Sequence, residues 1–152
     1  MPKELAGLQA EEKQLIFDAI PLVTILIAGA DGNIDAKETA WAKKLTKIRG
    51  YKETETLSSL YKIVGETLDD RLAYFIDQLP GGTKKRTADI ITELTKLNDI
   101  LPKIDSWYAK LFYEDLVSFA KHVAEASGGF MGMVTINSKE SELIDLPMIN
   151  KL

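Results

Sequence analysis

The segment that decides the fold runs from Val23 to Glu38 and reads VTILIAGADGNIDAKE. Its apolar half has the character of a buried helix, and Gly32 suits the left-handed backbone that ends a helix. Asp35 and Glu38 stand three residues apart, which is the spacing of a capping box with Asp in the Ser/Thr place. The segment therefore predicts two helices joined by a short turn, the first over about residues 10–30 and the second ending at Gly50.

Outward from this junction, apolar residues recur at helical spacing, and no stretch shows the sustained alternation of a strand. Pro21 predicts a kink or a break in the first helix. The breaker Pro80-Gly81-Gly82 separates two groups of further helices. These are expected over about residues 55–64, 69–79, 83–101 and 102–127, with a last helix capped by Asn137-Ser138-Lys139-Glu140. The sequence thus predicts an all-α fold, a single compact bundle of about seven helices spanning residues 1–152.

Composition places the chain among soluble globular proteins. It has 152 residues, of which 45% are hydrophobic and 28% are charged, so one domain with a sizeable core is expected. Cysteine is absent, which excludes disulfides, thiolate metal sites and thiol nucleophiles. The net charge of -4 argues against a nucleic-acid partner, which would need a basic face. No segment has the apolar run of a signal peptide or a membrane span, so we expect a cytoplasmic protein.

The two ends of the chain carry an internal repeat, over residues 23–38 and 119–140. Both copies join an apolar helix and a glycine stop to an isoleucine and a second, capped helix. The second copy has six extra residues between its glycine and its isoleucine, and it carries Ser127 and Asn137 in place of Asp31 and Asp35. The repeat predicts two pseudo-symmetric halves. The matched pairs are Ala28 with Ala124, Ala30 with Ala126, Gly32 with Gly128, Ile34 with Ile136, Lys37 with Lys139 and Glu38 with Glu140.

An apolar helix ending in A-x-A-D-G, then I-D-x-x-E into a second helix and a Gly-Gly-Phe variant near the C-terminus, resembles the TerB-like family associated with tellurite resistance. The resemblance is most specific over residues 22–45 and 116–146. It implies an all-helical bundle with two pseudo-symmetric halves and no catalytic activity. It also implies a divalent-metal site at the acidic motif and a role in bacterial stress or tellurite-resistance machinery near the membrane. The acidic positions that carry over are Asp31, Asp35, Glu38 and Glu140.

The acidic segment reproduces the second half of an EF-hand loop, from its fifth to its twelfth position. Asp31, the Asn33 carbonyl, Asp35 and Glu38 fall at positions five, seven, nine and twelve. The first half is missing, because positions one and three carry no carboxylate. An all-oxygen donor set favours calcium, magnesium or manganese over zinc. The segment is therefore a candidate site for a divalent cation.

A second interpretation of the same residues needs no metal. Asp35 and Glu38 can satisfy the free amides at the start of a helix and complement its dipole, while Gly32 ends the preceding helix. Caps and stops explain every residue of the motif except Asp31. The two interpretations stay open: a TerB-like protein with a cation site, or a helical protein-interaction scaffold in which the motif is a helix cap.

Other residues are expected to be structural. His122 is the single histidine, and Trp41, Trp107, Tyr108 and Phe112 fall at the helical spacing of core residues. Glu114 and Asp115 are neighbours in sequence and should point in different directions around a helix. Two basic groups are expected to form solvated faces or anion-binding patches: Lys84-Lys85-Arg86, and Lys43, Lys44, Lys47, Arg49 and Lys52.

Catalysis finds little support in the sequence. There is no glycine-rich phosphate loop, no nucleophile elbow and no histidine-rich metal cluster. The apolar segment from Gly128 to Val134 is expected to pack between the two halves or to meet a partner. We therefore expect a non-enzymatic protein that acts through one or more protein partners, with its oligomeric state open.

Overall fold

The computed structural model describes residues 1–30, 32–51, 56–126 and 142–152, and in these ranges it contains helices and turns but no strand. The prediction of an all-α bundle is confirmed. None of the described helices is long and apolar enough to cross a membrane. The five long helices are α1 (Ala10–Ala28), α2 (Ala36–Tyr51), α3 (Ser58–Gln78), α4 (Thr83–Thr95) and α6 (Ser106–Ala126), and the short ones are η1 (Lys3–Leu5), α5 (Leu97–Ile100) and η2 (Leu101–Lys103).

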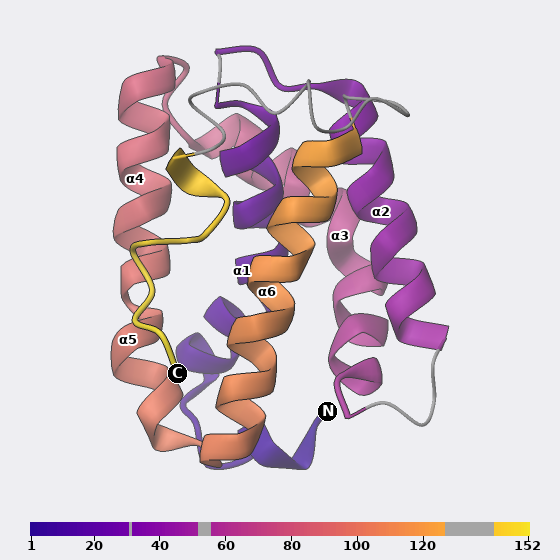
Figure 1. Cartoon of the computed structure of the whole chain (residues 1–152), viewed down its shortest axis with the longest axis vertical. Helices are drawn as coiled ribbons and strands as arrows, with labels where there is room; N and C mark the ends of the chain where they lie inside the picture. The colour runs from indigo at the N-terminus through magenta and orange to yellow at the C-terminus, as the bar shows by residue number, and fades with distance from the viewer. Residues whose placement is uncertain (31, 52–55, 127–141) are drawn as a thin grey trace.

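Helix α1 forms the centre of the bundle. Figure 1 shows it between α4 on one side and α2 and α3 on the other, with α6 in front. Every residue of α1 from Ile16 to Ala28 is buried, and α2, α3, α4, α5 and α6 all contact this helix. A helix that is apolar on all sides needs neighbours on all sides. The other helices therefore share one core, built around α1.

Pro21 lies inside α1 and does not break it. A proline in a helix interior removes one hydrogen bond and costs about 3 kcal/mol. The adjacent side chains of Ile20 and Leu22 are buried in the core. Burying one such side chain contributes roughly 1.5–3 kcal/mol, so the two together offset the cost of the proline. Of the two predicted outcomes, the break is wrong, because tertiary packing holds the chain helical at this position, and the kink stays a prediction.

Helix α3 is continuous from Ser58 to Gln78, where the sequence pattern predicts two shorter helices. Its buried residues Tyr61, Val64, Leu68 and Leu72 follow each other at three- and four-residue spacing, so one apolar stripe crosses the expected gap. This stripe allows α3 to pack along both α1 and α2. The expected number of about seven helices is therefore wrong: the described residues form five long helices and the single turn α5.

The segment before α6 also differs from the expectation. The helix predicted over about residues 83–101 ends at Thr95, and α5 and η2 follow it as separate short turns. Pro102 lies in η2 rather than at the start of α6. Helix α6 begins instead after Asp105, whose Oδ1 accepts a hydrogen bond from the Tyr108 N–H at 3.0 Å. A side-chain cap therefore decides where this helix begins.

The C-terminal residues return to the core. Leu146 and Ile149 are buried, and Asn98 donates from Nδ2 to the Met148 carbonyl at 3.0 Å. The cap predicted at residues 137–140 and the loop from Gly128 to Val134 lie outside the described residues, as does the junction of the second repeat copy. The first copy of the repeat, between α1 and α2, is described except for Asp31.

Candidate functional site

The junction between α1 and α2 keeps the predicted left-handed glycine and the predicted cap, but α1 ends at Ala28, with Gly29 as its C-cap, rather than at Gly32. Gly32 adopts a φ of 105°, in the left-handed region that favours glycine. The Asp35 N–H donates to the Ala28 carbonyl at 3.0 Å and so ties the turn back to the end of α1. Asp35 Oδ1 accepts hydrogen bonds from the backbone N–H groups of Lys37 at 2.8 Å and Glu38 at 3.2 Å. Asp35 is therefore a helix cap, which satisfies two of the free amides of α2.

The four predicted metal ligands have different environments. Asp31 lies outside the described residues, and Asn33 is exposed. Asp35 is half-buried and uses Oδ1 for the cap, while the Glu38 side chain is 0% exposed. Among the described residues, no three histidines or carboxylates gather where they could hold a metal ion. The divalent-cation site therefore stays a prediction that depends on Asp31.

Arg86 lies at the same end of α1 and is buried, being 7% exposed. Its Nη2 donates to the Gly29 carbonyl at 2.9 Å. A cation is favourable there because the last carbonyls of a helix have no partner within the helix and carry partial negative charge. The expectation of a solvated basic face fails for Arg86, while its neighbours Lys84 and Lys85 are exposed. No sequence rule distinguishes Arg86 from Lys84 and Lys85, because the carbonyl group that Arg86 binds lies at the end of another helix, α1.

A hollow of about 480 Å³ lies between the C-terminal end of α2, the start of α3 and the first half of α6. We call it the α2–α6 cleft. One wall comes from α6, where three steps of three or four residues lead from Trp107 through Leu111 and Glu114 to Ser118 along one helical face. The cleft is lined by Arg49, Thr56, Leu57, Tyr61, Trp107, Leu111, Glu114, Asp115 and Ser118.

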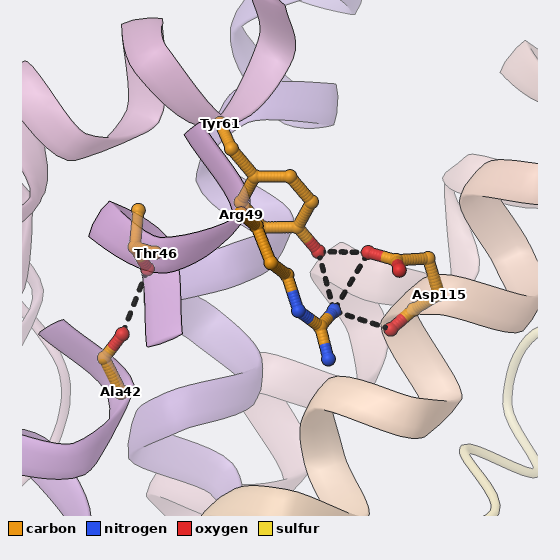
Figure 2. A network of polar contacts seen from close by, with 5 residues as sticks. All are labelled: Ala42, Thr46, Arg49, Tyr61 and Asp115. Atoms are coloured by element: carbon orange, nitrogen blue, oxygen red, sulfur yellow. Dashed lines mark hydrogen bonds and ion pairs between the residues drawn. The ribbon is translucent and has the colours of Figure 1, made fainter. Parts of the chain in front are cut away.

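Arg49, Tyr61 and Asp115 form a polar network at the inner side of this cleft (Figure 2). Arg49 Nη1 donates to Asp115 Oδ2 at 2.7 Å, to the Asp115 carbonyl at 3.1 Å and to the Tyr61 hydroxyl oxygen at 2.9 Å. The Tyr61 hydroxyl donates to Asp115 Oδ2. The Arg49 guanidinium also lies over the rings of Tyr61 and Phe119, with Cζ 5.4 Å from each centroid. The network therefore joins α2, α3 and α6 through one guanidinium.

Burial sets the protonation of this network. It raises the pKa of the Tyr61 hydroxyl well above the ordinary value, and the Asp115 carboxylate raises that pKa further. Burial also acts to lower the pKa of Arg49, but the oxygens of Tyr61 and Asp115 outweigh it, so that the pKa of Arg49 is raised. At neutral pH Tyr61 is thus a hydrogen-bond donor and Arg49 a cation. This arrangement suits binding and structural support rather than proton abstraction.

The cleft corrects two expectations drawn from the sequence. The sequence predicts a solvated basic group that includes Arg49, yet Arg49 is half-buried and paired with Asp115. Trp107 has the spacing of a core residue, yet it is 60% exposed at the first turn of α6. Glu114 and Asp115 are neighbours in sequence, and both line this cleft. The sequence holds no signal for these outcomes, because the other walls come from α2 and α3.

A second hollow, of about 560 Å³, lies over α1 where α3 and α4 flank it. We call it the α1 groove. Its apolar residues are Leu15, Leu22, Phe75 and Leu79, together with the ring of Tyr74. Its polar residues are Glu11, Gln14, Asp18, Arg71, Gln78, Asp89, Thr92 and Glu93.

An ion pair between α1 and α3 lies in this groove. Arg71 donates from Nε to Asp18 Oδ1 at 2.9 Å and from Nη2 to Asp18 Oδ2 at 2.7 Å. Its guanidinium lies 4.6 Å from the ring centroid of Tyr74 and 4.9 Å from that of Phe75. A bidentate pair stacked on rings is the geometry in which arginine binds most specifically. Arg71 is therefore paired with Asp18. The other carboxylates that line the groove do not share this arginine.

No protein-family model, no curated protein and no solved structure matches this chain. The α2–α6 cleft and the α1 groove are each built from aromatic rings, carboxylates and one arginine that is already paired. Both arrangements favour recognition of a positively charged group, because the paired arginine leaves carboxylates in excess.

Proposed function

We propose that this chain is a non-enzymatic, TerB-like interaction protein that binds a basic amphipathic helix of a protein partner in the α1 groove. The TerB-like assignment is supported by the helical bundle and by the glycine stop and capped turn between α1 and α2. The role in a bacterial stress or tellurite-resistance system follows from that resemblance. In this proposal the acidic segment serves as the cap of α2, and binding of a divalent cation is the alternative.

The shape of the α1 groove supports a helical partner. Its α1 residues run from Glu11 through Leu15 and Asp18 to Leu22, which is one helical face about 16 Å long at 1.5 Å per residue. Helices α3 and α4 both pack against α1 and form the two sides of the groove. The floor is apolar where Leu22 is buried, and Leu15 is only partly covered. A partner helix of about three turns matches this length and would complete the packing around α1.

The charge of the groove supports a basic partner. Four carboxylates line it, those of Glu11, Asp18, Asp89 and Glu93, against the single cation Arg71. Since Arg71 is bound to Asp18, the lining residues carry three net negative charges, and the Glu93 carboxylate among them also forms an exposed ion pair with Lys96 at 2.8 Å. Such a surface attracts lysine and arginine side chains and disfavours acidic ones, which sets specificity and the rate of association.

A designed peptide tests this proposal directly. We would use a fluorescein-labelled helical peptide of about 14 residues, with leucines on one face and lysines on both flanks, and measure its anisotropy with the whole protein. The paired substitution Asp89→Lys and Glu93→Lys should weaken binding at least about tenfold, because it replaces attraction with repulsion along the α4 side. A peptide with glutamates in place of the lysines should not bind.

The paired substitution Glu66→Lys and Asp70→Lys is the matched control, since it makes the same charge change on α3 at exposed positions outside the groove. It should leave the affinity within about twofold of the original value. If the lysine peptide fails to bind, or binds the α4 variant as tightly as the unmodified protein, the groove is not its binding site. Thermal unfolding of each variant checks that the fold is retained.

A further inference from the structure

We propose that the α2–α6 cleft is a separate site for an organic cation with an aliphatic stem, an alkylammonium or alkylguanidinium group, held between the Trp107 ring and the carboxylates of Glu114 and Asp115. The site is independent of the α1 groove, because the two hollows share no lining residue. Its volume of about 480 Å³ falls within the range of pockets that hold small organic molecules.

The charges of the cleft favour a cation. Arg49 is the one cation among its lining residues, and Nη1 of that side chain already donates to Asp115 and Tyr61. Asp115 receives these bonds at Oδ2 and at its main-chain carbonyl, and no described residue donates to its second carboxylate oxygen, Oδ1, which carries no dashed line in Figure 2. Asp115 Oδ1 is therefore available to a ligand that donates hydrogen bonds.

Glu114 supplies the second negative charge. Its ion-pair partner is Lys110, one turn earlier on α6, at 3.9 Å, and both side chains are more than half exposed. An exposed pair at this distance contributes little, so the Glu114 carboxylate can turn to a ligand at low cost. With Arg49 neutralised by Asp115, Glu114 leaves the cleft with one net negative charge. An anionic ligand would meet this charge as repulsion.

Trp107 supplies the aromatic face. It begins the cleft wall on α6 and is 60% exposed, which is unusual for so large an apolar side chain in a bundle with a well-filled core. Tryptophan is the aromatic residue that attracts cations most strongly. Leu57 and Leu111 line the same cleft and can cover an aliphatic stem. The ring, the apolar walls and the carboxylates together match a cationic head on a hydrocarbon chain.

Three ligands with five carbon atoms each separate charge from apolar burial: pentylammonium, 1-pentanol and pentanoate. The chain has two tryptophans, so the Trp41→Phe variant leaves Trp107 as the single reporter. We expect a saturable change of Trp107 fluorescence with pentylammonium at millimolar concentrations, and none with the other two ligands. An equal response to 1-pentanol, a response to pentanoate, or no saturable response at all would overturn the cation site.

A charge-neutral substitution locates the ligand. Glu114→Gln lies at an exposed position and should fold as the unmodified chain does, while weakening pentylammonium binding about three- to tenfold. Glu125→Gln, on the same helix but outside the cleft, should bind as before. Unchanged affinity in Glu114→Gln would overturn the assignment. The variant with Asp89→Lys and Glu93→Lys should keep the response to pentylammonium, which distinguishes failure of this site from failure of the α1 groove.

Discussion

Arg86 of α4 donates from Nη2 to the carbonyl oxygen of Gly29 at 2.9 Å, so a buried cation of one helix caps the C-terminal end of another. The two residues are 57 positions apart in the chain. The absence of a side chain at Gly29 makes this approach possible, since an added Cβ would lie 2.6 Å from Arg86 Nη2. This contact places the charged start of α4 against the junction that leads into α2.

Gly29→Ala should destabilise the fold by about 1–3 kcal/mol, because the new methyl group would meet both Arg86 Nη2 and, at 2.9 Å, the backbone oxygen of Ile25. The backbone oxygen cannot move without distorting α1. Urea unfolding followed by circular dichroism measures the effect. Gly81→Ala is the matched control, because nothing lies within 4 Å of a Cβ at that position. Equal stability of the two variants would contradict the close packing at Gly29.

Removing the hydroxyl groups of two buried tyrosines should have opposite effects. Tyr61→Phe should cost about 1–3 kcal/mol, since the hydroxyl donates to the Asp115 carboxylate and accepts from Arg49. The Tyr108 side chain is 0% exposed, and its hydroxyl has no hydrogen-bond partner among the described residues. Tyr108→Phe should therefore be neutral or stabilise the fold by up to about 1 kcal/mol. Both predictions are tested by comparing the free energies of unfolding of the two variants with that of the unmodified chain. A similar loss of stability in the two variants would contradict them.

Stability should fall at alkaline pH through Tyr61. Its pKa in the folded protein is raised well above the ordinary value of 10.0, so the folded state keeps a proton that the unfolded state loses. The contribution of Tyr61 is therefore fully present below pH 10 and is lost as the pH rises above it, by up to about 1.4 kcal/mol per pH unit. Urea unfolding between pH 8 and about pH 11 should show a steeper decline for the unmodified chain than for Tyr61→Phe. Parallel curves would contradict the raised pKa.

Loss of the α2 cap should weaken the junction. Asp35→Ala removes the oxygen that accepts from the Lys37 and Glu38 amides and should cost about 1 kcal/mol, within a range of roughly 0.5–2 kcal/mol. Asp35→Ser keeps a capping oxygen without the charge and should recover most of that loss. Thermal unfolding of both variants gives the comparison. If the serine variant is as unstable as the alanine variant, the charge of Asp35 matters more than its hydrogen bonds.

Divalent cations should leave the protein unchanged if the acidic segment is only a cap. Calcium, magnesium and manganese, each up to millimolar concentrations, are then expected to alter neither the Trp41 fluorescence nor the melting temperature. The reason is that Asp35 Oδ1 already accepts two amides and Glu38 is buried. A saturable change that disappears in the Asp31→Asn and Glu38→Gln variant would instead establish the cation site.

Local sequence rules were enough for the helical class and for the turn that opens α2. The left-handed backbone at Gly32, the cap at Asp35 and the break at Pro80-Gly81-Gly82 all follow from backbone geometry and from hydrogen bonds within a few residues. The end of α1 lies earlier than expected, at Ala28 with Gly29 as the C-cap. Local rules failed at Pro21 and along α3. In both places burial against other helices outweighs a local preference for interruption, and burial depends on neighbours that are distant in sequence.

The sequence by itself determined that this chain forms helices, where several of them begin and end, and that Asp35 caps α2. Only the tertiary structure decided which charged and aromatic residues are buried. Arg49 and Arg86 leave solvent because their acceptors lie on other helices, 66 and 57 residues away, while Trp107 stays exposed beside a cleft. A buried charge is stable only beside a partner, and a partner on another helix becomes visible only when the helices have packed.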